Sequence, residues 1–180
     1  MKMKTLLFVL LAAVLMMGAC DKIANVTFDS DIKADLEVYV PEDSFKADIN
    51  GAFSVSKTVN PLADPEVEKY INNIKGWDVT GISGEVISVS KEGVSLVSAD
   101  IEVFSDNDNA TWHFPTPPAI PLVVGQEILL ENTNGQWDAI NNILDEKKEF
   151  TVSMSGVTDQ GDVTFVIQII ISTEIEASAL

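Results

Sequence analysis

Apolar side chains recur at every second position near the C-terminal end of the chain. Val163, Phe165, Ile167, Ile169 and Ile171 follow this spacing without a break. Because successive side chains of a β-strand point to opposite faces of a sheet, these five share one face. An unpaired strand this apolar would be an aggregation hazard, so it needs a partner strand on each side. The segment is therefore predicted to be an inner strand.

The same period recurs through most of the chain and predicts about eight or nine strands. Strands that follow one another with turn residues between them favour antiparallel pairing, and residues 77–89 and 97–103 are predicted to form a hairpin. The predicted fold class is mainly β: an antiparallel β-sandwich, with a closed antiparallel β-barrel as the alternative. The predicted strands cover residues 32–40, 53–59, 77–89, 97–103, 111–114, 127–131, 150–154 and 163–171.

Two segments have helical spacing. Val67, Ile71 and Ile74 form one apolar stripe, which predicts a short amphipathic helix over Pro65–Lys75. A second amphipathic helix is predicted over Gln136–Glu146 on the same grounds.

The tetrapeptide Ile-Asn-Asn-Ile occurs twice, at 71–74 and at 140–143, once in each predicted helix. One interpretation is an internal duplication of a strand–helix–strand unit. The other is a coincidence between two short amphipathic helices, which is favoured because the flanking residues do not match.

The N-terminal segment has the composition of an export signal. Two lysines precede the apolar run Leu6–Met17, and the small residues Gly18 and Ala19 follow it. A basic start, a short apolar core and a small-residue exit are typical of a secretory signal peptide. The run is too short for a permanent membrane-spanning helix, which needs about 20 apolar residues. Residues 1–19 are therefore predicted to be a cleaved signal.

The tetrapeptide Met17-Gly18-Ala19-Cys20 resembles the lipobox of bacterial lipoproteins, and the signal resembles those of Bacteroidetes-like bacteria. The resemblance implies cleavage before Cys20, a diacylglyceryl group on its sulfur and an acyl group such as palmitate on its new amine. Cys20 is the one cysteine of the chain, so it cannot form an intramolecular disulfide, and lipidation explains a lone exported thiol. Residues 20–31 are then the lipidated N-terminus and a short tether, and residues 32–180 a single β-rich domain.

The lipid anchor determines the predicted location. Two acyl chains hold a protein stably on a bilayer, so the mature chain is expected in the bacterial cell envelope. Asp21, directly after the lipidated residue, would retain a lipoprotein of enterobacterial type at the inner membrane. In Bacteroidetes-like bacteria it is compatible with delivery to the outer membrane. The outer membrane, on its periplasmic or surface face, is favoured.

The chain is strongly acidic. It has 28 acidic residues against 11 basic ones, all lysines, and a formal net charge of −17. This charge repels nucleic acid, so no nucleic acid partner is expected. The absence of arginine also removes the usual bidentate clamp for phosphate and carboxylate ligands. A solvated acidic surface is favoured over a binding site for Ca²⁺ or a cationic partner.

Sequence motifs for catalysis are missing. His113 is the one histidine, so a Ser-His-Asp triad would have to use it, and its place at the end of a predicted strand favours an ordinary surface residue. Residues 81–85 (Gly-Ile-Ser-Gly-Glu) lack the final glycine of a nucleophile elbow. One histidine and one lipidated cysteine cannot supply the ligands of a zinc site. The chain is therefore predicted to be no enzyme and to carry no cofactor other than the covalent lipid.

Three residues are weak candidates for ligand binding. Asp106 and Asp108 place hard oxygen ligands at alternating positions, as a calcium site does, but a solvated Asn/Asp-rich turn is favoured. Trp112 precedes a proline-rich segment and is predicted to be the most exposed tryptophan, which makes it a candidate for stacking on a sugar. Trp77 and Trp137 are predicted to belong to the core.

These features together predict a membrane-anchored lipoprotein with a non-catalytic binding or envelope-structural role, and with a glycan or a protein as its partner. Two alternatives remain open. A carrier of a hydrophobic small molecule requires an apolar cavity larger than about 300 Å³. A carboxylate-based hydrolase, such as a glycosidase, requires two inward-facing acids in a cleft.

Overall fold

The apolar strand near the C-terminus is paired on both sides, as predicted. The computed structural model describes residues 25–42, 51–114 and 118–179, and in it β9 (Val163–Ser178) lies between β1 (Asn25–Val40) and β3 (Ile74–Val89). Every second residue of β9 from Val163 to Ala177 is buried. The prediction of an inner strand is confirmed.

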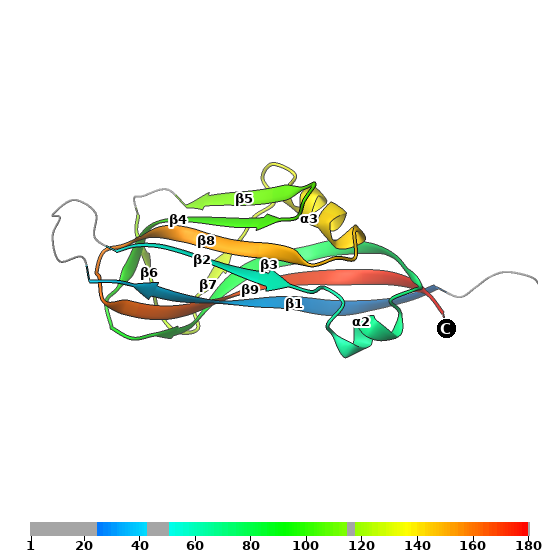
Figure 1. Ribbon diagram of the computed structural model, residues 1–180, viewed down its shortest axis with the longest axis horizontal. Coiled ribbons are helices and arrows are strands. Elements are labelled where there is room, and N and C mark those ends of the chain that lie inside the picture. The colour runs from blue at the N-terminus through cyan, green and yellow to red at the C-terminus, as the bar shows by residue number, and fades with distance from the viewer. Residues whose placement is uncertain (1–24, 43–50, 115–117, 180) are drawn as a thin grey trace, which may run out of the picture.

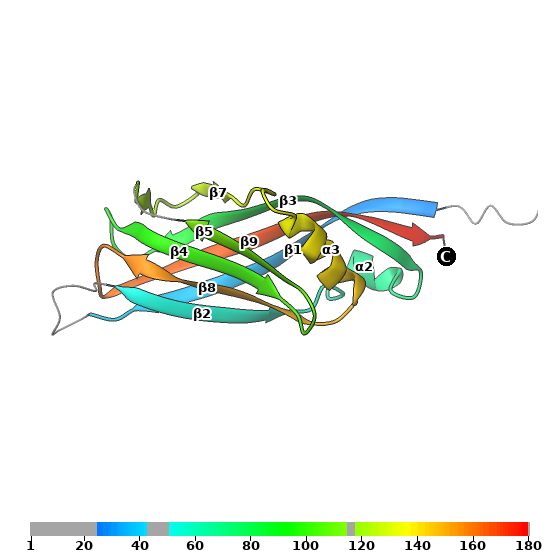
Figure 2. The same cartoon turned by 90° about the horizontal axis from the view of Figure 1, so that it is seen from above.

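Two antiparallel sheets stack face to face (Figures 1 and 2). The first has the order β1-β9-β3-β7 and the second the order β2-β8-β4-β5, with a short β6 paired to β4. Within the described residues the sheets are not closed into a barrel, so the predicted sandwich is confirmed and the barrel alternative is wrong. The remaining strands are β2 (Ala52–Val59), β4 (Ser95–Phe104), β5 (Asn109–Phe114), β6 (Ile120–Pro121), β7 (Glu127–Leu129) and β8 (Phe150–Thr158).

The predicted hairpin of residues 77–89 and 97–103 does not form. β3 pairs with β9 and β7 in the first sheet, whereas β4 pairs with β8, β5 and β6 in the second. The turn between β3 and β4 therefore crosses from one sheet to the other. Each of the two strands has one apolar face, and the faces are buried in the space between the sheets.

The core lies between the inner faces of the two sheets. Its largest fully buried side chains come from both sheets, among them Leu36, Ile101, Met154 and Phe165. Phe53 of β2 meets Phe165 of β9 edge to face across the layers, with ring centroids 5.3 Å apart. Each buried side chain of this size contributes roughly 1.5–3 kcal/mol, and close packing of the two faces holds the layers together.

β1 starts earlier than predicted. It begins at Asn25 instead of residue 32, because β9 continues to Ser178 and every residue of β1 has a partner on it, from Asn25 opposite Ser178 to Val40 opposite Val163. The segment from residue 25 to residue 31 is thus strand and not tether. The predicted signal and Cys20 lie outside the described residues.

The first predicted helix is only partly correct. α2 (Pro65–Lys69) starts where predicted, with the Asp64 side chain accepting a hydrogen bond from the N–H of Glu66 at 2.7 Å. It ends before residue 75, because residues 70–73 form a turn and Ile74 starts β3, where it pairs with Ala177. Ile74 has helical spacing in the sequence, but it is buried as part of the first sheet and not on a helix.

The second helix is confirmed as α3 (Gln136–Asp145). Ile140, Ile143 and Leu144 are its buried apolar residues, and the Asn141 side chain accepts a hydrogen bond from the N–H of Val79 at 2.9 Å. Figure 2 shows α3 beside β3 and β5, at the side of the sandwich where β7 has ended.

The two Ile-Asn-Asn-Ile copies adopt different structures. The copy at 140–143 is helical, whereas the copy at 71–74 is a turn followed by the first residue of β3. The prediction that both lie on helices is wrong, and the difference gives no support to a duplication.

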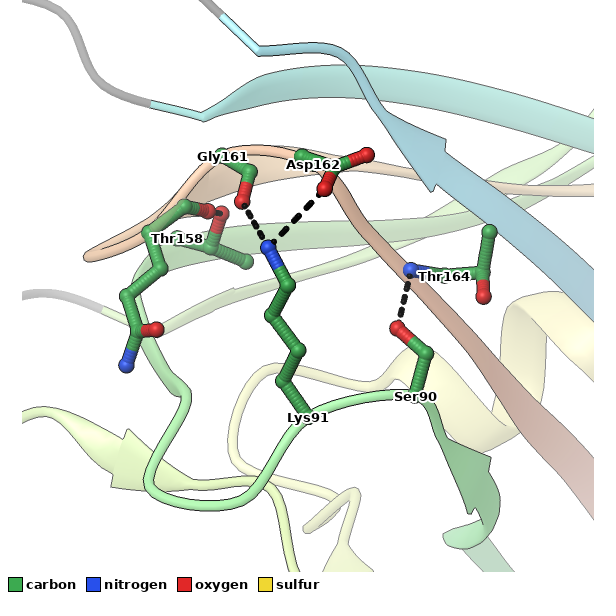
Figure 3. A network of polar contacts seen from close by, with 7 residues as sticks. Ser90, Lys91, Thr158, Gly161, Asp162 and Thr164 are labelled. Atoms are coloured by element: carbon green, nitrogen blue, oxygen red, sulfur yellow. Dashed lines mark hydrogen bonds and ion pairs between the residues drawn. The ribbon is translucent and has the colours of Figure 1, made fainter.

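The molecule is elongated, with two distinct ends (Figure 1). We call the end that holds Asn25, α2 and the C-terminal end of β9 the base, and the opposite end the distal end. At the distal end Lys91 Nζ donates to the Gly161 carbonyl at 3.2 Å and to Asp162 Oδ2 at 3.1 Å. Ser90 Oγ accepts from the N–H of Thr164 at 2.9 Å (Figure 3). These contacts fix the β3–β4 and β8–β9 turns to each other.

Carboxylates face one another on the outside of the first sheet, near the base. Glu174 of β9 lies directly opposite Asp29 of β1 on one side and Asp78 of β3 on the other. All three residues are exposed. Like charges directly opposite each other on a sheet destabilise it.

Glu174→Gln is therefore expected to stabilise the fold by roughly 0.2–1 kcal/mol at neutral pH and low ionic strength, and the gain should shrink at high salt. Urea denaturation at two salt concentrations measures both effects. Glu176→Gln is the matched control, because Glu176 accepts a hydrogen bond from Asn25 and has Thr27 and Gly76 opposite it. An equal gain for the two variants, or none for Glu174→Gln, would contradict the repulsion.

Candidate binding site

Two surface grooves lie on either side of one segment, residues 127–134, which we call the rib. The first groove, about 440 Å³, is lined from β3 and β9 by Thr80, Gly81, Ser83 and Ser172, and from α3 by Trp137. The second groove, about 430 Å³, is lined by four consecutive residues of β5, from Thr111 to Phe114. Leu129 and Glu131 of the rib line both grooves.

The rib is held in place by strand pairing and by two indole hydrogen bonds. Leu129 pairs with Ser83 of β3, and the N–H of Leu130 donates to the Ile82 carbonyl at 3.0 Å. Trp112 Nε1 donates to the Glu131 carbonyl at 3.0 Å, and Trp137 Nε1 to the Leu130 carbonyl at 3.4 Å. Ile128 and Leu130 are buried, which leaves the Leu129 side chain 64% exposed between the grooves.

Polar side chains shape the turn from the rib into α3. Gly135 adopts a positive φ of 78°, which glycine tolerates without strain. The buried Gln136 side chain accepts a hydrogen bond from the N–H of Asn134 at 2.7 Å, and Asn132 Oδ1 accepts one from the N–H of Trp137 at 3.3 Å. The indole of Trp137 is thereby placed at the wall of the first groove.

Trp112 is not the exposed tryptophan that the sequence predicts. Its side chain is buried, with 6% exposure, because Trp112 pairs with Ile101 of β4 and shares the inner face of β5 with Ala110. A ring with so little exposed area offers little surface for stacking on a sugar. Trp77 is buried as predicted, whereas Trp137 is half-buried and lines a groove.

His113 is an exposed residue of β5, as predicted, and its Nδ1 lies 2.7 Å from Asp100 Oδ1. Asp100 is opposite His113 on one side and Ser155 on the other. The carboxylate thus lies between the histidine and the serine. In a Ser-His-Asp triad the histidine occupies the middle position, so this row of residues does not match one.

Asp106 and Asp108 belong to the turn between β4 and β5. Ser105 Oγ accepts hydrogen bonds from the N–H groups of Asn107 and Asp108, and Asp108 Oδ1 accepts one from the Asn142 side chain. Among the residues that the structure describes, no cluster of three or more His, Cys, Asp or Glu side chains could hold a metal ion. The hydrogen bonds of Ser105 close the turn, and the one from Asn142 ties it to α3.

Two carboxyl groups at the C-terminal end of α3 have shifted pKa values. Burial raises the pKa of Asp145, against the charge of Lys147 and a hydrogen bond from the N–H of Trp77. The pKa of Glu146 is lowered, and the largest cause is a hydrogen bond from the Asn107 side chain. A hydrogen bond from Ser105 and the charge of Lys148 lower this pKa further, whereas desolvation opposes them. Neither carboxyl lines a groove beside the rib.

Comparisons with known proteins leave the family open. No family model and no curated protein matches this chain. Three virus chains are among the similar solved structures. One is from Desmodium yellow mottle tymovirus, with 5% sequence identity, coverage of 89% of this chain and 87% of that chain, and a TM-score of 0.32. The second is from a semi-empty virus-like particle of the giant freshwater prawn Macrobrachium rosenbergii nodavirus, with 7% identity, coverage of 87% and 95%, and a TM-score of 0.36. The third is from Mud crab tombus-like virus, with 8% identity, coverage of 93% and 98%, and a TM-score of 0.34. At these TM-scores the likeness carries no argument about function.

In the described ranges, no helix has the length and apolarity to span a bilayer.

The Glu146 shift predicts a pH-dependent stability. A carboxyl whose folded pKa is below its unfolded value contributes stability above the unfolded pKa, and this is lost as pH falls through the folded pKa. Asn107→Ala removes the largest cause of the shift. The variant should be less stable than the parent at pH 7, and the difference should narrow as pH falls below about 4.5, the ordinary value for this group.

Urea denaturation of both proteins between pH 7 and pH 3 measures this difference. The same Asn107→Ala change in a Glu146→Gln background is the control, since no carboxylate then remains to titrate. The assignment of the pKa shift to Asn107 is contradicted if the loss of stability caused by Asn107→Ala does not change with pH when Glu146 is present. It is also contradicted if this loss changes with pH equally in the Glu146→Gln background.

Proposed function

We propose that this chain is a bacterial lipoprotein, anchored through lipidated Cys20, which presents a non-catalytic β-sandwich binding domain at the cell envelope. The observation that carries the proposal is the lipobox-like Met17-Gly18-Ala19-Cys20 after a signal-type apolar run. Covalent diacylglycerol and an N-acyl group supply the membrane contact, and the outer membrane is the favoured location.

The position of β1 supports attachment of the sandwich through its base. Cys20 precedes the first residue of β1, Asn25, by a few positions, and a fully extended chain covers at most about 3.6 Å per residue. The base of the sandwich would therefore lie within roughly 20 Å of the bilayer. β1 has 16 residues, so the distal end lies about 50 Å from the base.

The two grooves beside the rib support binding as the role of the domain. Each falls in the size range of ligand sites, about 300–1,000 Å³, and each lies between described secondary-structure elements that hydrogen bonds hold in place. Buried side chains from both sheets fill the space between the layers, which favours binding on the outside over a hydrophobic carrier. The acidic surface favours a glycan or protein partner over nucleic acid.

Cys20→Ser tests the anchor. The hydroxyl is a far weaker nucleophile than a thiolate, so the substituted chain should stay unlipidated and leave the detergent phase in a detergent partition experiment. Mass spectrometry of the parent N-terminus should find acyl groups on Cys20. Asn25→Ser, in the first residue of β1, is the matched control and should partition with the detergent. If the Cys20→Ser protein fractionates like the parent, the lipoprotein assignment is wrong.

A further inference from the structure

The first groove combines one aromatic ring with neutral hydrogen-bonding groups. Trp137 of α3 supplies the ring, and Thr80, Ser83, Asn132 and Ser172 supply hydroxyl and amide groups. The remaining polar side chains are the carboxylates of Glu127 and Glu131, and no lysine lines the groove. The side chains that line this groove therefore offer several hydrogen-bond acceptors and no positively charged donor.

These groups select among classes of ligand. A phosphate or a carboxylate would meet Glu127 and Glu131 without a cation to bind it, so anionic ligands are disfavoured. A purely apolar ligand would cover the Ser83 hydroxyl and the carboxylates of Glu127 and Glu131 without giving them hydrogen-bond partners, which costs free energy. A neutral saccharide satisfies both conditions, because its hydroxyls donate to carboxylates and exchange hydrogen bonds with hydroxyls, while its C–H faces pack on an indole and on Leu129.

Gly81 gives the first groove its depth. It lies at an irregularity in the pairing of β3 with β9, between Val79 and Gly81, and opposite Ser172. A Cβ at position 81 would meet nothing within 4 Å, so the space above this residue is open. Gly76 of the same strand has equally open space but does not line the groove.

We propose that the first groove binds a neutral glycan segment, with Trp137 and Leu129 as the apolar contacts and with Glu131, Asn132 and Ser83 as the hydrogen-bonding contacts. This inference deepens the proposed function and rests on it, because it names the ligand class of the binding domain.

The mature lipidated protein, in a polyoxyethylene detergent that carries no sugar headgroup, is titrated with malto-, cello-, xylo- and chito-hexaose and with hexalysine. Calorimetry measures affinity, and tryptophan emission reports the groove, since Trp77 and Trp112 are buried and Trp137 is half-buried. At least one neutral hexasaccharide is expected to bind and to change the emission, and hexalysine is expected not to compete with it.

Gly81→Leu fills the groove and should weaken saccharide binding at least tenfold, whereas Gly76→Leu, the matched control, should leave it unchanged. Leu129→Ala removes an exposed apolar contact without touching the core and should weaken binding several-fold, so the test does not depend on one variant. Unchanged circular dichroism verifies folding.

Three results would overturn the inference: no binding of any neutral hexasaccharide, equal affinity of Gly81→Leu and the parent, or displacement of the saccharide by hexalysine. The last result would point to a cationic peptide as the ligand. Each of these failures is distinct from a failure of the lipoprotein assignment, because detergent partitioning of Cys20→Ser does not depend on the groove.

Discussion

The pairing of β9 on both sides is the constraint on which the rest of the structure depends. Its inward side chains, from Val163 to Ala177, are buried, and they can be buried only if β1 and β3 cover its two edges and the second sheet covers its face. The length of β9 in turn fixes the length of β1 and β3, which have 16 residues each. An elongated sandwich with a base and a distal end follows from this one strand.

The grooves arise where this arrangement is incomplete. β7 pairs with β3 over only three residues, Ser83 to Glu85, so the edge of β3 nearer the base has no strand partner among the described residues. α3 covers part of that edge through the hydrogen bond between Val79 and Asn141. The rib then runs between the two sheets toward α3, held by the indoles of Trp112 and Trp137. The lipid anchor proposed at Cys20 would attach the chain at the base and leave this side of the sandwich accessible to a ligand.

Much of the fold could be predicted, because period-two alternation reports directly which side chains face the core. Structure and prediction differ where two periodicities fit the same residues, or where the partner of a strand lies far away in the sequence. Ile74 fits a helical stripe and a strand equally well, and only pairing with Ala177 decides between them. Whether β3 and β4 pair or stack is likewise set by β9 and β8, which come later in the chain.

The candidate site could not be found from the sequence, because no local motif marks it. Its residues come from β3, the rib, α3 and β9, and Gly81 matters through the side chain that it lacks. Its place at the start of an amphipathic helix predicts a core position for Trp137, whereas the residue is half-buried at a groove wall. The prolines that follow Trp112 favour exposure, whereas the alternation along β5 places the residue on the inner face.

Native-state hydrogen exchange tests the central role of β9 most directly. If β9 is the strand that the other elements cover, its amides from Phe165 to Ile171 should exchange most slowly, near the rate set by global unfolding. The amides of β5 and β7, at the sheet edges, should exchange faster. Exchange of the β9 amides as fast as those of β5 would contradict this account of the fold.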